Sequence, residues 1–501
     1  MAGQTLSGSF SETSNDTAII VPGKKPFTVS FKQLTKDILE FQSELAKLGI
    51  GRDDAVSIAL PNTYEFIVSF LATTYQRAVL APLNPGYKKN EFEFYINDLS
   101  SALLLVPKGA CERDEPSIWA GRNYGAAIAE CYLEGTKVVL DLKEKGKLGQ
   151  RKAQRVSQAL PEDVALVLHT SGTTGKPKAV PLTHRNLTRT MRNIQQTYEL
   201  SPKDRTMLVM PLFHVHGLLA GLLSPLMSGG SVVVPPKFSA STFWDDFTQH
   251  GANWYTAVPT IHQILLKNPA PEPIPNIRFI RSCSSSLSPN TMAALEQTYK
   301  TPVLEAYAMT EAAHQMCSNQ LPHRGKRKAG SVGIGQGVEV RILDLSGMEV
   351  PQGSEGEICV CGENVTKGYI NNTKANAEAF TTDKFFRTGD QGKKDEDGYV
   401  IITGRIKELI VRGGEKISPI ELDNVITSIP EVGEAVSFGI PDEMLGQQVG
   451  VAVVPKAGKQ VLEQNVIAFV KAKLAAHKTP KRVSLAVLGH DCVLTTCRFG
   501  F

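Results

Sequence analysis

Cysteine is scarce in this sequence, and its arrangement excludes two classes of protein. Eight cysteines occur among 501 residues, without the paired spacing of a zinc site or of a compact disulfide framework. Residues 1–16 are polar and lack the apolar core of a secretory signal. We therefore expect a protein of a reducing compartment, with the cytoplasm as its location.

Net charge is also small, at +4. Lysines and arginines are interspersed with acidic residues along most of the chain, which differs from the basic tail or patch of a nucleic-acid-binding protein. We expect no nucleic-acid partner and favour a small molecule. A hydrophobic content of 42% over this length is enough for more than one core.

Long hydrophobic runs are missing. The most lipid-like stretch, residues 208–227, is interrupted by Pro211, His214, His216 and Pro225. A membrane span needs about 20 predominantly apolar residues in succession. The stretch therefore predicts a buried strand followed by a buried helix, and no transmembrane segment.

Short β-branched runs alternate with amphipathic stretches after Val164. Predicted strands cover residues 164–169, 231–236, 252–259, 277–283 and 302–309, and predicted helices cover residues 184–198, 241–251, 260–267 and 288–300. Thr183 is placed to cap the first of these helices. The alternation is typical of parallel strands with crossover helices, so we predict an α/β core whose ligands gather at the carboxyl ends of the strands.

Two changes of pattern follow this core. Residues 335–350 and 356–370 alternate at period two between glycine-bearing turns, which predicts a smaller β-rich subdomain. After Gly404, strand-like and helix-like stretches share a short remaining segment. We predict a large N-terminal domain over residues 1–404 and a small α+β lid over residues 405–501.

The loop after the strand at 164–169 is rich in hydroxyl side chains, glycine and lysine. Such a loop offers unobstructed backbone N–H groups and, through Lys176 and Lys178, positive charge, which together wrap a polyphosphate. Gly172 and Gly175 are too close for the Walker loop of P-loop motors and kinases, and Pro177 follows Lys176. A flexible loop without a ligand is the alternative.

Four motifs occur in the order found in the adenylate-forming enzymes, the superfamily of acyl-CoA synthetases, peptide-synthetase adenylation domains and luciferases. They are the loop at residues 170–178, YAMTE at 307–311, FRTGD at 386–390 and GRIK at 404–407. Over roughly residues 25–483 the chain resembles this superfamily, and within it the peroxisomal-type coenzyme A synthetases and oxalate–CoA ligases of fungi and plants. The resemblance implies an adenylation domain with several subdomains, a C-terminal lid and an ATP-dependent acid–CoA ligase that uses Mg²⁺, ATP and CoA.

The resemblance assigns nucleotide binding to the loop and to three later residues. The set is Thr170, Ser171, Gly172, Thr173, Thr174, Gly175, Lys176, Lys178, Tyr307, Asp390 and Arg405. Tyr307 would stack on adenine, or it is a core aromatic residue. Asp390 and Arg405 would hold the ribose hydroxyls, or they form a structural ion pair.

The predicted catalytic residues are Glu311, Thr310 and Lys407. Activating a carboxylate with ATP brings anions together, so the site needs a metal ion and cations. Glu311 would bind Mg²⁺, with Thr310 on phosphate, and Lys407 would be the hinge residue of the lid. A helix cap for Glu311 and an exposed surface lysine for Lys407 are the alternatives.

Gly413 and Gly414 would let the pantetheine arm of CoA pass close to the backbone. By themselves they indicate only a turn.

Polar residues in the predicted acid pocket point to the substrate. His214, Ser284 and His314 take positions where an enzyme for fatty acids would have apolar or glycine residues. They favour a second carboxylate on the acid, and the resemblance implies oxalate. His214 and His216 could instead bind a metal ion, although no third ligand is apparent, and Cys283 lacks the basic partner of a nucleophile.

The carboxyl-terminal sequence departs from the family pattern. In relatives, a segment similar to residues 477–483 is followed by a Gly-Lys pair whose lysine reaches the substrate carboxylate and the phosphate, whereas here no lysine follows Lys481. A natural isoform and a gene-model error are the two explanations for the altered sequence. The alternative function is then an adenylation-impaired protein that binds a nucleotide or an adenylate. The Ser-Lys-Leu type of peroxisomal signal is also absent from the sequence shown, so a peroxisomal location would require a different carboxyl terminus.

We expect weak adenylation by this chain, because a cation at the developing charge commonly contributes about 10²–10³ in rate. Thioester formation from a preformed adenylate should be less affected. Pyrophosphate release would be measured for this chain and for a variant whose residues after 483 are replaced by a family-like segment with the lysine. Equal rates would contradict the prediction.

Overall fold

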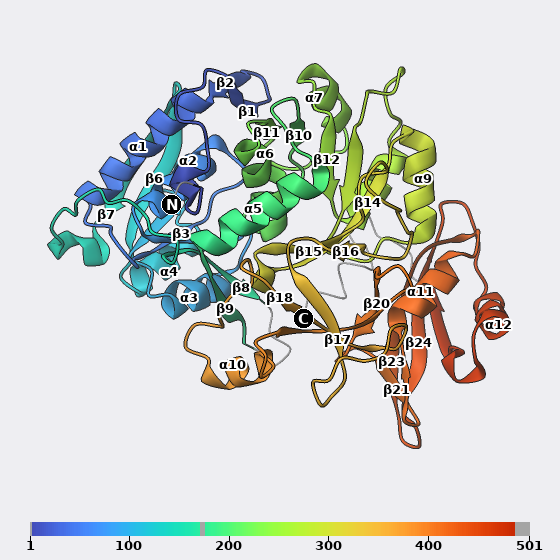
Figure 1. Cartoon of the computed structure of the whole chain (residues 1–501). Helices are drawn as coiled ribbons and strands as arrows, with labels where there is room; N and C mark the ends of the chain where they lie inside the picture. Colours follow the sequence, from blue (N-terminus) through green and yellow to red (C-terminus); the bar gives the residue numbers. More distant parts are fainter. Residues whose placement is uncertain (1–2, 171–175, 486–501) are drawn as a thin grey trace.

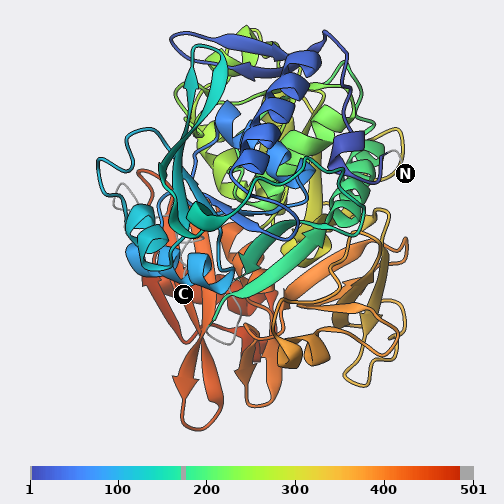
Figure 2. The ribbon, with the colours of Figure 1, turned by 90° about the vertical axis from the view of Figure 1, so that its left-hand side faces the viewer.

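The computed structural model describes residues 3–170 and 176–485 of the chain. These residues form two large sheets of nine and seven strands and two smaller sheets of four and five strands. Figures 1 and 2 show the segments of the two smaller sheets, coloured orange to red, in the lower part of the molecule and the first third of the chain, in blue to cyan, mainly above them. The mixed α/β class that the sequence predicts is confirmed.

The nine-stranded sheet is parallel in its centre and antiparallel at its ends. In spatial order its strands are β16 (Ile334–Gly335), β15 (His314–Ser318), β14 (Val303–Met309), β13 (Phe279–Ser282), β12 (Trp254–Ala257), β10 (Arg205–Met207), β11 (Ser231–Val233), β1 (Thr17–Val21) and β2 (Phe27–Ser30). The four predicted strands between residues 231 and 309 are thus confirmed as β11 to β14.

The seven-stranded sheet is built in the same way, with antiparallel strands only at its two edges. Its order is β7 (Lys137–Glu144), β6 (Ala127–Glu134), β5 (Leu103–Val106), β3 (Ala55–Ile58), β4 (Val79–Pro82), β8 (Val164–Thr170) and β9 (Lys178–Thr183). The predicted strand at 164–169 is β8. The sheet therefore delivers the carboxyl end of β8, and with it the start of the predicted phosphate loop, beside the second sheet.

Most of the helices that alternate with these strands connect parallel strands as crossover elements. The helices are α1 (Phe31–Lys47), α2 (Tyr64–Tyr75), α3 (Lys89–Asp98), α4 (Pro116–Asn123), α5 (His184–Tyr198), α6 (Ser224–Met227), α7 (Phe243–Gln249), α8 (Pro259–Lys267), α9 (Pro289–Tyr299) and α10 (Thr373–Ala379). The Thr183 side chain accepts the Asn186 N–H at the start of α5, so the predicted cap is confirmed. Helices predicted at 241–251, 260–267 and 288–300 appear as α7, α8 and α9.

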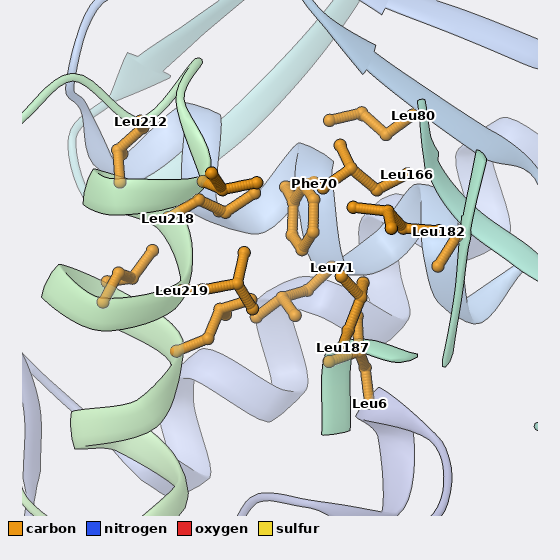
Figure 3. Close-up of a cluster of buried hydrophobic side chains, with 14 of the residues drawn as sticks. Leu6, Phe70, Leu71, Leu80, Leu166, Leu182, Leu187, Leu212, Leu218 and Leu219 are labelled. Atoms are coloured by element: carbon orange, nitrogen blue, oxygen red, sulfur yellow. The ribbon is translucent and has the colours of Figure 1, made fainter. Parts of the chain in front are cut away.

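The largest apolar core lies where α2 and α5 pack between the sheets (Figure 3). Phe70 of α2 is fully buried, and most of the leucines around it come from the seven-stranded sheet, from α2 and α5, and from the segment after β10. Ile19 and Val232 of the nine-stranded sheet belong to the same core. The labelled neighbours are Leu6, Leu71, Leu80, Leu166, Leu182, Leu187, Leu212, Leu218 and Leu219. This packing fixes the relative position of the two sheets, and hence of the two halves of the site.

Residues 208–227 differ from the sequence prediction. The strand β10 ends at Met207, before the stretch begins, and residues His216–Leu223 form a π-helix that continues into α6. Proline has no N–H to donate to a neighbouring strand. On either side of Pro211 the Asn62 side chain supplies the hydrogen bonds instead. It donates to the Met210 carbonyl at 3.0 Å and accepts the Leu212 N–H at 2.9 Å. The predicted strand is therefore wrong and the buried helix is confirmed, with wider turns.

Within residues 3–170 and 176–485, no helix combines the length and the apolar character that a membrane span requires.

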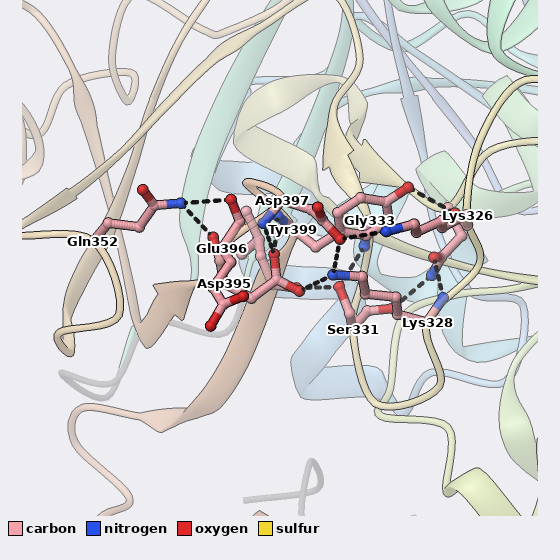
Figure 4. Close-up of polar contacts among 11 residues, drawn as sticks. Lys326, Lys328, Ser331, Gly333, Gln352, Asp395, Glu396, Asp397 and Tyr399 are labelled. Carbon is pink, nitrogen blue, oxygen red and sulfur yellow. Dashed lines mark hydrogen bonds and ion pairs between the residues drawn. The ribbon is translucent and has the colours of Figure 1, made fainter.

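The β-rich subdomain is a four-stranded antiparallel sheet, as the sequence predicts. Its strands are β17 (Glu339–Leu343), β18 (Gly356–Cys361), β19 (Phe386–Lys394) and β20 (Val400–Arg405). The turn between β19 and β20 is tied to the chain that leads into β16 (Figure 4). Lys328 bonds Asp395 and Asp397 there, and Tyr399 donates to the Lys326 carbonyl at 2.7 Å. These contacts hold β19 and β20 against the nine-stranded sheet.

The C-terminal unit is α+β, as predicted. Its sheet contains β22 (Glu415–Ile417), β21 (Ile410–Arg412), β24 (Gly446–Pro455), β23 (Val432–Asp442) and β25 (Arg482–Leu485), with helices α11 (Pro419–Thr427) and α12 (Glu463–Lys473) beside it. Arg405 is still part of β20, so the predicted boundary after residue 404 falls at the end of the four-stranded sheet. The boundary between domain and lid stays a prediction.

Replacing Phe70 with alanine should lower the free energy of unfolding by about 3–5 kcal/mol, because a cavity would replace a filled core position. Urea denaturation followed by circular dichroism would measure it. Leu39, on the exposed face of α1, is the matched control, and Leu39→Ala should change stability by less than about 0.5 kcal/mol. Equal losses for the two variants would contradict the packing described here.

Candidate active site

The predicted phosphate loop joins two antiparallel strands. Thr170 at the end of β8 is paired with Lys178 at the start of β9, so the next described element after β8 is an antiparallel strand and not a helix. This geometry differs from that of a Walker loop. Ser171, Gly172, Thr173, Thr174 and Gly175 lie outside the described residues, and their contact with ATP stays a prediction. Lys176 is exposed, and Lys178 Nζ lies 4.8 Å from the centre of the Tyr369 ring.

Glu311 meets this hairpin from the other sheet. It lies in a 3₁₀ turn, Thr310–Ala312, that directly follows β14, and its side chain is buried. Its Oε1 accepts hydrogen bonds from Tyr369 Oη at 2.9 Å and from Thr170 Oγ1 at 3.4 Å. The strand β15 follows, so Glu311 caps no helix. The structure thus brings the predicted Mg²⁺ ligand beside Thr170, which the sequence assigns to ATP.

The predicted adenosine-binding residues form one connected group, in which Tyr307 and Asp390 are buried and Arg405 is exposed. Tyr307 in β14 donates its hydroxyl proton to Asp390 in β19, and Asp390 Oδ1 lies 3.0 Å from Arg405 Nε in β20. Burial raises the pKa of the Asp390 carboxyl, and Arg405 opposes this shift. The structural ion pair is present, and Tyr307 is largely buried. Their contacts with adenine and ribose stay predictions.

A third group surrounds the predicted acid-binding residues Ser284 and His314. His216 Nδ1 lies 3.0 Å from Ser284 Oγ, and the ring of His216 stacks on that of His314 with centroids 5.2 Å apart. Ser284 and His314 have φ values of 74° and 105°, a region in which a non-glycine residue costs roughly 1–3 kcal/mol and which is concentrated at functional sites. Ser284 is exposed and His314 is buried.

His214 is separate from this group. Its side chain is exposed and its ring packs against that of Phe213, with centroids 4.7 Å apart. Among the described residues, no hydrogen bond or ring contact joins His214 to Ser284 or His314. Its part in acid binding stays a prediction, and so does the metal-binding alternative, since no group of three or more potential ligands forms in the described ranges.

Four residues that the sequence prediction missed complete these groups. They are Tyr369, which bonds Glu311, and His216, Thr256 and Arg281, which lie behind Ser284. Arg281 has a recognisable sequence feature, a charged residue inside the apolar run of β13. The sequence indicates His216 only as an alternative metal ligand with His214, and Tyr369 and Thr256 have no such feature, because only the fold places these three residues beside the site.

Lys407 is exposed in the turn after β20. This position is compatible both with a hinge residue and with an ordinary surface lysine. Gly413 and Gly414 form the two-residue turn between β21 and β22, with φ values of 59° and 89°. The turn is confirmed, and glycine suits it because side chains disfavour these angles. The predicted roles as hinge and in CoA binding stay open.

Comparison with known proteins identifies the family. The protein-family model for the AMP-binding enzyme matches residues 8–370. The family model for the AMP-binding enzyme C-terminal domain matches residues 421–487. The chain therefore belongs to the AMP-binding enzyme family.

Individual proteins resemble the chain over nearly its whole length. The oxalate–CoA ligase of Saccharomyces cerevisiae is 46% identical, with 96% of this chain and 93% of the relative covered. The oxalate–CoA ligase of Arabidopsis thaliana is 47% identical, with coverage of 93% and 91%. The crystal structure of ATP-bound MatB from Rhodopseudomonas palustris, 29% identical, superposes with a TM-score of 0.87 and covers 97% of this chain and 95% of that one.

Replacing Glu311 with glutamine should slow adenylate formation about 10²–10³-fold, because the variant removes the negative charge expected to hold the metal ion that offsets the phosphate charge. ATP–pyrophosphate exchange would measure it. Glu305→Gln is the matched control on the strand that leads to Glu311, since burial raises the pKa of Glu305 to about 8 and thus favours its neutral form at pH 7. Similar losses for the two variants would contradict the role of Glu311.

Proposed function

We propose that this protein is an ATP-dependent acid–CoA ligase that activates oxalate. The relatives are named as CoA ligases, which favours a ligase over a protein that only binds a nucleotide. The observation that carries the choice of acid is the polar group of His216, Ser284 and His314, where an enzyme for a long apolar acid would need an apolar surface. Oxalate is the acid in the names of two relatives that cover most of the chain.

Two steps convert the acid. An oxygen of the carboxylate forms a bond to the α-phosphorus of ATP while the bond from that phosphorus to the β-phosphate bridge breaks, giving the acyl-adenylate and pyrophosphate. The sulfur of CoA then bonds to the acyl carbon, AMP leaves with its oxygen, and the thiol proton passes to solvent. Neither step needs a covalent bond to the protein, in agreement with the buried position of Cys283.

Carboxylate and hydroxyl oxygens are the ligands that Mg²⁺ prefers, and it is usually held by one or two carboxylates together with substrate phosphates. Glu311, with Thr170 and Thr310 beside it, fits this requirement. Mg²⁺ bound there would neutralise charge on the phosphates. The protein's own part is to hold the Glu311 carboxylate in place, for which the Tyr369 hydroxyl supplies a hydrogen bond.

Adenosine would lie against Tyr307, with the ribose hydroxyls on Asp390. Arg405 already holds this carboxylate, which keeps it oriented before the nucleotide arrives. The lid would turn about Lys407, and the turn at Gly413 and Gly414 would then approach CoA. Large effective concentrations follow when two reactants are held in one orientation. These assignments extend the proposal to residues whose roles are inferred from the sequence.

Release of AMP with CoA would be compared for oxalate, malonate, acetate, 4-coumarate and octanoate. Oxalate should give the highest kcat/KM, because its second carboxylate can accept hydrogen bonds that a monocarboxylate leaves unmade. A chain carrying a family-like C-terminal segment would be run in parallel. A preference for octanoate or 4-coumarate in both chains would overturn the proposal.

His314→Ala should lower kcat/KM for oxalate at least about tenfold more than for acetate, the size expected for a hydrogen bond to a charged group. His323→Ala is the matched control, because His323 is an exposed histidine paired with Glu199. It should leave both acids unchanged. Equal losses for oxalate and acetate in His314→Ala would contradict the choice of substrate.

A further inference from the structure

Arg281 is a buried charge for which the site described so far has no use. Its side chain is fully buried in β13. Its Nε donates to Tyr198 Oη at 2.8 Å, its Nη2 to Gln315 Oε1 at 3.3 Å, and its Nη1 to Thr256 Oγ1 at 3.1 Å. All three acceptors are uncharged. Among the described residues, no carboxylate forms an ion pair with Arg281.

An unpaired buried cation is costly unless a counter-charge arrives. The two neighbouring histidines do not add to the charge. Burial, and after it the charge of Arg281, holds the pKa of both His216 and His314 well below the usual range. Both imidazoles are therefore neutral at pH 7, and the positive charge behind the acid site comes from Arg281.

The hydrogen bonds of Arg281 also have a fixed direction. A guanidinium can only donate, so Thr256 Oγ1 accepts from it, and His216 Nε2, which lies 3.5 Å from Nη1, faces the cation with its lone pair. The Thr256 hydroxyl then donates to His216 Nε2, with 2.7 Å between the two atoms. The imidazole proton is placed on Nδ1, which donates to Ser284 Oγ at 3.0 Å.

This direction leaves the hydroxyl proton of Ser284 available for another acceptor. His314 supplies a second unused group, because its Nε2 is buried and has no hydrogen-bond partner among the described residues. The cluster thus has the Ser284 hydroxyl as a donor for an anion, the His314 Nε2 atom without a described partner, and a positive charge behind them. This arrangement suits a dicarboxylic acid, which keeps a second negative charge after one of its carboxylates has reacted with ATP.

We infer that Arg281 is the residue that sets the preference for a doubly charged acid, acting as a positioning residue through Thr256 and His216 on Ser284. The inference rests on the proposed function and deepens it, since it names what makes this ligase select a dianion. Arg281 touches no reacting atom.

The experiment compares oxalate with oxamate, which has the same shape and one negative charge fewer. Dissociation constants would be measured by calorimetry with a non-hydrolysable ATP analogue present, together with KM and kcat. In Arg281→Met, oxalate should weaken about tenfold more than oxamate, because a unit charge in a low-dielectric interior acts on the second carboxylate. A buried lysine loses its proton more readily than an arginine, so Arg281→Lys should give a ratio between those of Arg281→Met and the unaltered protein.

Arg278→Met is the matched control. Arg278 directly precedes the same strand, pairs with Asp204 at 3.0 Å and is partly exposed. It should leave the ratio of oxalate to oxamate unchanged. Equal weakening of both acids in Arg281→Met, or a ratio that falls equally in Arg278→Met, would overturn the inference, since a merely structural arginine would give that result.

Thr256→Val keeps Arg281 and removes only the hydroxyl between it and His216. KM for oxalate should rise about tenfold while kcat stays within about threefold, the expected cost of one misdirected hydrogen bond to a charged group. An unchanged KM would overturn the inference, and this variant decides the matter should Arg281→Met fail to fold. If the unaltered protein binds oxalate more tightly than oxamate and forms no oxalyl-CoA, the proposed function fails and the inference stands. If it binds both equally, the inference fails.

Discussion

Burial of charge is the constraint on which this structure depends. A carboxylate or guanidinium that leaves water must find donors, acceptors or an opposite charge. Glu311, Asp390 and Arg281 are all buried, and each is satisfied by side chains from distant parts of the chain. The contacts that meet this requirement are the same contacts that assemble the site. A change that separated the sheets would therefore leave several charges without partners at once.

The two large sheets and the four-stranded sheet each contribute one side of the site. Thr170 comes from the seven-stranded sheet, Glu311 and Tyr307 follow or belong to β14 of the nine-stranded sheet, and Asp390 and Arg405 come from the four-stranded one. The leucine core around Phe70 fixes the first two (Figure 3), and the ion pairs around Lys328 fix the third (Figure 4). Packing far from the nucleotide thus positions the residues expected to bind it.

The sequence predicted most helices and strands of the α/β core, but it did not predict which distant side chains form hydrogen bonds with them. Strands β11 to β14 and helices α7 to α9 show their periodicity locally, because each buries one face or both. Pro211 shows the limit of this reasoning, since the apolar residues around it are buried without forming a strand, and the Asn62 side chain supplies the hydrogen bonds. Neither partner could be inferred from the other, because more than a hundred residues lie between them.

The sequence by itself determined the class of chemistry. Motifs such as YAMTE and FRTGD are short and contiguous, so their resemblance to those of the adenylate-forming enzymes can be recognised without knowledge of the fold. The tertiary structure alone decided which histidine bonds Ser284 and which charge lies behind it. His214 and His216 are equivalent as letters, yet the π-helix buries one beside Thr256 and leaves the other exposed. The reason is physical: the direction of a hydrogen bond and the cost of a buried charge depend on neighbours in space, which the order of residues does not contain.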